Sequence, residues 1–467
     1  MSWDGQTYHQ ETIIQLLEDY NPVYNVISNE NSGFIFTNHY SKGLEINSAA
    51  ISRATGNIED GKAINLFLII TSFYISFATI LLMYDFITIK IGLILAFIIS
   101  LNPVSIYQSL SFYVDGYLAS TITCLFFIFI LISDKITKLR SVTLSALIII
   151  ILNAKLSGLL YLAIFIFGFL CWFYVYKKSD LSKISKCLIA SFLIGTIVVG
   201  FNPYVTNTLT GGNPFYPLIG TSIMDDYDFM TGNTPTNLQN MSQFEKLFSS
   251  LFSHSSTGSG ISEYKIPFTF TKDDLKSFRK PDARIEGFGP FFSGAIILSV
   301  LNILLILNGK KYDITKKQNN SMIISTLILL VIISVLIFPE SWWARFAPQL
   351  WLFPIFPLFI SLEKNNNNSI KYKIINYSII LVLLINVLII SAVYSEYQYS
   401  ETKSVDKQLN HISSITNNEI IVKFNGFNSN RYRLNDYAIE YSEVQKWNCS
   451  NPIQLYHSQT QLCIVQK

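Results

Sequence analysis

The sequence predicts an all-α polytopic membrane protein with extracytoplasmic loops and a small extracytoplasmic C-terminal domain of α/β or β type. Half of the 467 residues are hydrophobic and only 14% are charged, whereas about a quarter of the residues are charged in an ordinary soluble domain. Apolar runs of membrane-spanning length recur along the chain. Lys and Arg gather between alternate runs, which is the pattern of cytoplasmic loops.

Nine apolar runs reach spanning length. They cover residues 63–84, 91–109, 117–133, 156–176, 187–203, 289–308, 321–338, 346–362 and 373–393. A shorter run at 141–153 is separated from the next by Asn153-Ala154-Lys155. We interpret 141–153 as a short spanning helix that is joined by a tight outer turn to the span at 156–176. This brings the total to about ten spans.

The short loops fix the orientation, because Lys and Arg are retained on the cytoplasmic side. Fifteen of the 34 basic residues fall in five short loops: Lys90; Lys135, Lys138 and Arg140; Lys177, Lys178, Lys183 and Lys186; Lys310, Lys311, Lys316 and Lys317; Lys364, Lys371 and Lys373. The short loops of the other side hold almost none. With the Lys- and Arg-rich loops assigned to the cytoplasm, the N-terminal segment, the long central loop and the C-terminal tail lie outside.

The pattern divides the chain into five parts. Residues 1–62 form a first extracytoplasmic loop with an acidic motif, 63–203 and 289–393 form two groups of transmembrane helices, 204–288 form a large extracytoplasmic loop, and 394–467 form a small extracytoplasmic domain. The segment before Trp3 is too short for a signal sequence. Either the first span carries its own N-terminal tail outward, or an upstream helix precedes it; the resemblance described below favours the helix, which would make eleven spans.

Two features describe the predicted outer parts. In the C-terminal domain, Cys449 and Cys463 face an oxidising compartment and are expected to form a disulfide, with free thiols as the alternative, and 420–424 alternates like a β-strand. In the central loop, the Ser- and Gly-rich stretch near 253–260 suggests a segment that orders over substrate, although an Asp-rich loop is more often simply solvated. No ligand is assigned in that loop, whose other ionisable residues include Asp225, Asp226, Asp228, His254, Asp273 and Asp274. The Asn-rich run Asn365–Asn368 is a cytoplasmic linker.

Charge excludes several classes of function. The net charge of +3 and the absence of a basic cluster with interleaved aromatic residues exclude a nucleic-acid partner. No ionisable residue lies at the centre of a predicted span, which argues against an ion channel or a proton-coupled transporter. The ionisable residues instead lie at the outer ends of spans, as expected for an enzyme acting on a lipid-linked phosphate. They are Asp4, His9, Glu11, His39, Lys42, Glu45, Asp115, Lys155 and Arg345.

The segments Trp3-Asp4-Gly5-Gln6-Thr7-Tyr8-His9-Gln10 and His39-Tyr40-Ser41-Lys42-Gly43-Leu44-Glu45 resemble the first outer loop of bacterial GT-C glycosyltransferases, which include protein O-mannosyltransferases and aminoarabinose transferases. Ser41 stands where that family often has proline. Three further motifs fit in order: Phe112-Tyr113-Val114-Asp115-Gly116, Asn153-Ala154-Lys155-Leu156-Ser157-Gly158, and Gly212-Asn213-Pro214-Phe215-Tyr216-Pro217. The resemblance runs from about residue 3 to residue 362.

The resemblance implies an inverting transferase that moves a sugar from a polyprenyl-phosphate donor to a glycan, lipid or protein acceptor at the outer face of a bacterial inner membrane. Asp4 would be the general base, with Asp115 and Glu45 lining the site. Apart from the resemblance, the charge and outer position of Lys155 and the forked guanidinium of Arg345 suit both to hold the donor phosphate. Tyr8, His9, His39 and Lys42 complete the predicted substrate-binding set.

Each role has a simpler alternative. Asp4 and Asp115 are placed to cap helices, and Lys155 and Arg345 to anchor the membrane interface. His9 and His39 are candidate ligands for a divalent cation, with ordinary loop hydrogen bonding as the alternative. Two other functions also remain open, a polysaccharide polymerase such as an O-antigen polymerase and a non-enzymatic flippase or transporter of lipid-linked glycans.

Overall fold

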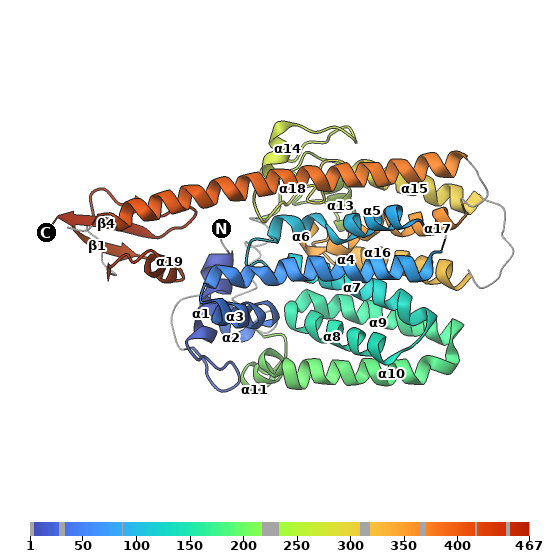
Figure 1. Cartoon of the computed structure of the whole chain (residues 1–467), viewed down its shortest axis with the longest axis horizontal. Coiled ribbons are helices and arrows are strands. Elements are labelled where there is room, and N and C mark those ends of the chain that lie inside the picture. The colour runs from blue at the N-terminus through green and yellow to red at the C-terminus, as the bar shows by residue number, and fades with distance from the viewer. Residues whose placement is uncertain are drawn as a thin grey trace.

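The computed structural model describes residues 4–27, 33–85, 87–216, 233–308, 318–364, 370–415, 418–444 and 449–466. The sequence features at Trp3, Pro217, Asp225, Asp226, Asp228, residues 310–317 and Asn365–Asn368 lie outside this part of the chain. The described part is mostly helical, with one small sheet near the C-terminus (Figure 1).

A cap of short helices precedes the first long helix. It contains η1 (Gly5–His9), α1 (Gln10–Leu17), α2 (Gly33–His39), α3 (Gly43–Thr55) and η2 (Ile58–Lys62). The first half of the bundle follows with α4 (Ala63–Met83), α5 (Ile89–Ser100), α6 (Pro103–Gln108), α7 (Asp115–Asp134), α8 (Lys138–Ala154), α9 (Leu156–Tyr176) and α10 (Lys178–Leu193). The turns η3 (Ile194–Val199) and η4 (Phe201–Val205) lead from α10 to α11 (Thr206–Gly211).

The second half begins with two short helices of the central loop, α13 (Gln243–Leu251) and α14 (Lys272–Ser277). The bundle continues with α15 (Phe292–Asn308), α16 (Gln318–Ile337), η5 (Ala344–Phe346), η6 (Pro348–Leu352), α17 (Phe356–Lys364) and α18 (Ile370–Ser413). The C-terminal domain consists of β1 (Asn418–Lys423), α19 (Asn430–Asp436), β2 (Ser442–Glu443), β3 (Ile453–Gln454) and β4 (Gln461–Gln466).

The bundle is organised around α7. Every residue in the apolar window of this helix is buried, and α7 contacts α4, α8, α16 and η6. By contrast, only 22% of the corresponding windows of α4 and α10 is buried. A helix that is apolar on all sides needs apolar surroundings. The exposed apolar sides of these outer helices therefore suit contact with lipid.

Six helices among the described residues are long and apolar enough to cross a membrane. They are Ile58–Met83, Asp115–Asp134, Leu156–Tyr176, Lys178–Val199, Asn320–Ile337 and Ile370–Ser413. These six helices indicate an integral membrane protein.

The other four predicted spans are shorter or interrupted. The run at 91–109 is divided between α5 and α6, because Asn102 caps α6 through the Val104 N–H and Pro103 follows it. The runs at 141–153 and 289–308 correspond to the 17-residue helices α8 and α15. The run at 346–362 is not one helix, because it begins at the last residue of η5, contains the turn η6, and reaches α17 only at Phe356.

The C-terminal domain is carried by α18, which continues 20 residues past the apolar run that ends at 393 and spans 44 residues in all. Its sheet has the strand order β2-β1-β4-β3, with β1 antiparallel to β4 and parallel to β2. The predicted strand at 420–424 lies largely within β1. Cys449 and Cys463 form the expected disulfide, with their Cα atoms 6.0 Å apart.

The C-terminal domain docks on the first segment of the chain. The Arg431 guanidinium lies 3.3 Å from the Glu11 carboxylate and 3.5 Å from that of Glu18. The Ser429 hydroxyl donates to the Gln6 carbonyl at 2.9 Å. Residues separated by more than 400 positions thus meet at the end of the bundle that carries α1, α3 and α19 (Figure 1). We call this the site end; it is the predicted outer end.

Candidate functional site

Arg345 lies in the turn η5 and is shared by three carboxylates from three different segments. Its guanidinium nitrogens lie 3.6 Å from an oxygen of Asp4, 3.5 Å from one of Asp115 and 3.5 Å from one of Asp282. The Arg345 side chain is only 14% exposed. These distances exceed those of close charge-assisted hydrogen bonds, which are about 2.7–2.9 Å. Arg345 is therefore held between the carboxylates without a short bond to any of them.

Lys155 supplies a second cation to the same group. Its ammonium donates to the Asp115 carboxylate at 2.7 Å. The other Asp115 oxygen accepts from the Gln108 amide at 3.2 Å, and the Gln108 carbonyl accepts from the Gly116 N–H at 2.7 Å. Because α7 begins at Asp115 and α9 begins after Lys155, two helix starts bring this ion pair together. We call Asp4, Asp115, Lys155, Asp282 and Arg345 the Arg345 cluster.

Asp282 joins the cluster from the loop before α15. Its carboxylate accepts from the Trp343 indole N–H at 2.9 Å and lies 3.5 Å from the Arg284 guanidinium. Burial raises the pKa of Asp282, while the positive charges of Arg345 and Arg284 oppose the rise. Burial lowers the pKa of Lys155, and its partner Asp115 opposes this change.

Aromatic rings enclose the cations of the cluster. The Arg345 guanidinium lies 4.9 Å from the Trp343 ring centroid, 5.1 Å from that of Phe346 and 5.3 Å from that of Tyr113. The Lys155 ammonium lies 4.4 Å from the Phe346 ring centroid. Rings at these distances attract a cation and exclude water, so charge interactions inside the cluster are strengthened.

Tyr8 lies close enough to the cluster for the charges of Asp4 and Arg345 to change its pKa. Burial raises the pKa of its phenol well above the ordinary value, and the negative charge of Asp4 raises it further while Arg345 lowers it. The Tyr8 ring also contacts Phe36, with 4.8 Å between ring centroids. Tyr8 thus remains a neutral hydrogen-bonding group at neutral pH.

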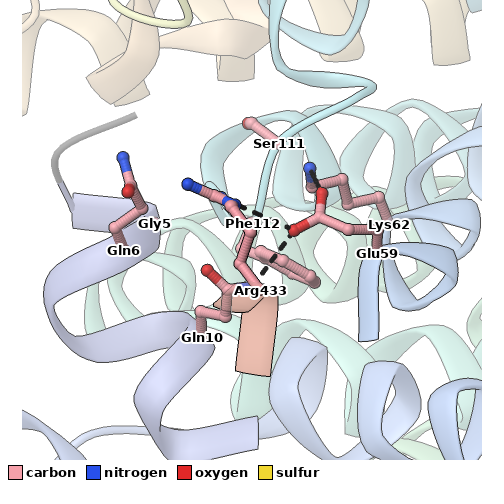
Figure 2. A pocket seen from close by; sticks show the side chains of 8 residues that line it. All are labelled: Gly5, Gln6, Gln10, Glu59, Lys62, Ser111, Phe112 and Arg433. Atoms are coloured by element: carbon pink, nitrogen blue, oxygen red, sulfur yellow. Dashed lines mark hydrogen bonds and ion pairs between the residues drawn. The ribbon is translucent and has the colours of Figure 1, made fainter. Parts of the chain in front are cut away.

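A small hollow, with room for about one water molecule, lies near the cluster. It is lined by Gly5, Gln6, Gln10, Glu59, Lys62, Ser111, Phe112 and Arg433 (Figure 2). In Figure 2 the Glu59 carboxylate lies between Lys62 and Arg433, and the Arg433 guanidinium is 4.0 Å from it. Gly5 follows Asp4 and Phe112 precedes Tyr113, so the hollow opens beside the cluster.

The helix-capping alternative does not describe Asp4 or Asp115. Asp4 precedes η1 and makes no side-chain capping hydrogen bond to it. Asp115 is the first residue of α7, and its carboxylate is bound by Lys155 and Gln108. Both carboxylates point to the cluster instead of to their own helices.

Glu45 and His9 form a separate buried pair. The His9 ring Nδ1 lies 2.5 Å from the Glu45 carboxylate, and the two side chains are 7% and 5% exposed. The second Glu45 oxygen is buried and has no hydrogen-bond partner among the residues that the structure describes. Tyr8 lies between this pair and the Arg345 cluster, because its ring centroid is 4.2 Å from that of His9 and its phenol interacts with the charges of Asp4 and Arg345.

His39 and Lys42 are held by two asparagines. His39 Nδ1 lies 2.9 Å from the Asn207 side-chain oxygen. The Lys42 ammonium donates to the Asn202 side chain at 2.5 Å and to the Tyr40 carbonyl at 2.8 Å. Burial lowers the pKa of Lys42 to about 7, and the charge of Glu45 opposes this change. These contacts join the first segment to η4 and α11, apart from the Arg345 cluster.

Two positions were missed from the sequence, Asp282 and Arg284. Both precede the apolar run that begins at 289, but they lie several positions before it, in a loop with many other ionisable residues, so this signal does not single them out. The Ser- and Gly-rich stretch near 253–260 is bonded to its surroundings, with Ser256 and Ile285 in a β-bridge and His254 N–H donating to the Glu263 carbonyl at 2.8 Å. Its ordering over substrate stays a prediction.

Candidate metal ligands do not gather in the part of the chain that the structure describes. Within these residues no group of three or more His, Cys, Asp or Glu side chains is arranged to hold a metal ion. His9 and His39 have different partners, Glu45 and Asn207.

Comparison with known proteins identifies no family. No protein-family model matches this chain, and no curated protein sequence matches it.

Proposed function

We propose that this membrane protein is a glycosyltransferase of the GT-C type that transfers a sugar from a polyprenyl-phosphate donor to a hydroxyl acceptor. One observation carries the proposal. Asp4, Asp115, Lys155 and Arg345, four ionisable residues predicted to lie on the outer side, meet in one enclosed cluster although they come from distant parts of the chain. Cations beside a free carboxylate oxygen are what such a transfer requires.

Lys155 and Arg345 are the proposed phosphate ligands. A phosphodiester oxygen would compete with the carboxylates for Arg345, whose contacts to them are all 3.5 Å or longer. Asp115 keeps Lys155 in place through the 2.7 Å hydrogen bond. As the bond between the anomeric carbon and the phosphate oxygen breaks, these two cations would stabilise the charge that develops on the polyprenyl phosphate.

Asp4 is the proposed general base. When phosphate draws Arg345 away, the Asp4 carboxylate becomes available to take the proton of the acceptor hydroxyl. The acceptor oxygen then bonds to the anomeric carbon, and polyprenyl phosphate leaves with the electron pair. Inversion at that carbon follows from the resemblance to the family. The hollow beside Gly5 and Phe112 is the proposed approach of the acceptor.

The test measures release of polyprenyl phosphate from a radiolabelled lipid-linked sugar by purified protein in lipid vesicles. Asp4→Asn should slow release at least about 100-fold, as expected for the loss of a general base. Asp19→Asn is the matched control, because the Asp19 carboxylate of the same segment is 91% exposed. The control should react like the wild type.

Three outcomes separate the alternatives. Equal rates for wild type and Asp4→Asn would remove the general-base role from Asp4 and leave the transferase class intact. No turnover of any donor sugar by the wild type would reject the transferase. Movement of the intact lipid-linked sugar across the vesicle membrane would then favour the flippase.

A further inference from the structure

We propose that α13 and the segment 261–270 form an interfacial surface that lies in the headgroup region of the membrane leaflet at the site end of the bundle. This surface is defined by Phe244, Phe248, Ile261, Tyr264 and Ile266. The proposal does not depend on the proposed reaction. It concerns the central loop, which the sequence presents as a mainly polar, solvated connection.

The side chains of the interfacial surface are large, apolar and exposed. Phe244, Phe248, Ile261, Tyr264 and Ile266 are 65%, 50%, 75%, 63% and 74% exposed. Single exposed apolar residues are ordinary on a protein surface, but a group of large ones marks a binding surface. Something other than water is therefore expected to cover them.

The helix α13 is amphipathic. Phe244 and Phe248 are four positions apart and share the exposed face. Ser249 and Ser250 are buried on the opposite side of the helix, where the Ser250 hydroxyl donates to the Trp342 carbonyl at 2.6 Å. A short amphipathic helix with aromatic residues on its outer face is typical of a segment lying in a membrane interface.

One end of the interfacial surface is fixed to the end of a candidate span. The Gln243 amide donates to the carbonyls of Leu336 at 2.8 Å and Phe338 at 2.6 Å, at the end of α16. Leu336 and Ile337 are themselves 48% and 51% exposed. The apolar exterior of α16 therefore continues onto α13 where the helix leaves the bilayer.

The other end is fixed to the start of α15. A Cβ atom added at Gly294, in the first turn of α15, would lie 2.3 Å from the Phe268 ring, so that ring packs directly on the helix. The Lys265 ammonium donates to the Pro290 carbonyl at 2.7 Å, just before α15 begins. Both anchors place the interfacial surface at the boundary of the helical bundle.

The position of the interfacial surface next to α16 indicates that lipid covers it. The exposed apolar side chains of α16 reach Leu336 and Ile337 at its end, and the hydrogen bonds of Gln243 hold the interfacial surface directly beside them. The inner face of α13 contacts Trp342, which is stacked on Trp343 with 5.4 Å between ring centroids. The lipid boundary would thus lie one helix away from the Arg345 cluster.

The test is spin labelling of the full chain in lipid nanodiscs. Cys171→Ala and Cys187→Ser remove the two accessible free thiols, while Cys124 is buried and the Cys449–Cys463 disulfide is kept. A nitroxide is then attached to Phe248→Cys or Ile266→Cys. Collision rates with oxygen, which concentrates in lipid, and with a water-soluble nickel chelate report the surroundings of each label.

Two labelled positions calibrate the measurement. Phe67→Cys is the lipid control, because Phe67 lies in the second turn of α4 and is 56% exposed. Lys276→Cys is the water control, because the Lys276 side chain lies in α14 and is 62% exposed. Phe248→Cys and Ile266→Cys should show an oxygen-to-nickel ratio near that of Phe67→Cys and at least about fivefold above that of Lys276→Cys.

Two results would overturn the proposal. A ratio equal to that of Lys276→Cys at both positions would show that water covers the interfacial surface. Low collision rates with both reagents would show that a protein surface, such as a second copy of the chain, covers it. Testing two positions on different segments prevents a local distortion from deciding the result.

Discussion

The Lys155 ammonium lies 2.7 Å from the Asp115 carboxylate, although 40 residues and two bundle helices separate them in the sequence. The pair is a consequence of topology, because α7 starts and α8 ends at the same end of the bundle. Asp115 is 2% exposed and Lys155 25% exposed, so the pair lies largely out of water. Arg345 then binds the remaining Asp115 oxygen and connects the pair to Asp4 and Asp282.

Removal of Arg345 should destabilise the protein. Arg345→Ala leaves buried carboxylates with fewer counter-charges, and loss of one partner of a buried ion pair costs about 3–5 kcal/mol. The free energy of unfolding, followed by tryptophan fluorescence in detergent, should fall accordingly. Arg53→Ala is the control, because its pair with Asp19 is 62% and 91% exposed, and such pairs contribute about 0–1 kcal/mol. Equal losses for the two variants would contradict this expectation.

The buried pair of Lys265 and Glu286 predicts that a second substitution rescues the first. Both side chains are completely buried and form an ion pair. Glu286→Gln leaves the ammonium without a counter-charge and should cost about 3–5 kcal/mol of unfolding free energy. Lys265→Met combined with Glu286→Leu removes both charges and should recover most of this loss. A double variant as unstable as the single one would show that the fit of the side chains, and not their charge, causes the loss of unfolding free energy.

Lys42 predicts a dependence of stability on pH. Burial lowers its pKa in the folded state to about 7, whereas the unfolded value is about 10.4. Between these values the unfolded chain binds the extra proton, so the contribution of Lys42 to stability rises with pH, by up to about 1.4 kcal/mol per unit. The difference in unfolding free energy between wild type and Lys42→Met, measured from pH 7 to 10, should therefore grow in favour of the wild type. Lys276→Met, at an exposed side chain, should leave a constant difference.

The sequence placed Asp115, Lys155 and Arg345 together because each flanks an apolar run on the same side of the predicted membrane. Asp4 belonged to the same set of outer ionisable residues, and the resemblance of its motif supplied its role as general base. Asp282 was missed because it lies seven positions before its apolar run, in a loop whose other carboxylates gave no reason to prefer one. Tertiary contacts, such as the hydrogen bond from the Trp343 indole to Asp282, determine the geometry of this loop, and the local sequence pattern does not predict them.

The apolar pattern predicts the length of a helix only where helix-breaking residues such as Pro and Gly fall at the ends of the apolar run. The run at 346–362 has spanning length, but Pro348, Pro354 and Pro357 interrupt helical hydrogen bonding. The opposite occurs in α18, which continues past residue 393 because the following polar stretch contains neither Gly nor Pro. Val405 and Leu409 in that stretch pack into the core of the C-terminal domain, which supports the extension.

Gly43 predicts a coupling between the first segment and the cluster. A Cβ atom added there would lie 2.5 Å from the Asn153 carbonyl oxygen, two residues before Lys155. Gly43→Ala must therefore push α3 away from the end of α8, and overpacking of this kind costs about 1–3 kcal/mol. Gly260→Ala is the matched control, because nothing lies within 4 Å of its added Cβ atom. Under the proposed function, displacement of the Lys155 turn should also raise the KM for the lipid-linked donor in Gly43→Ala. Thermal unfolding and donor titration of the two variants measure both effects, and a Gly43→Ala protein as stable as Gly260→Ala would show that the contact between α3 and α8 yields without cost.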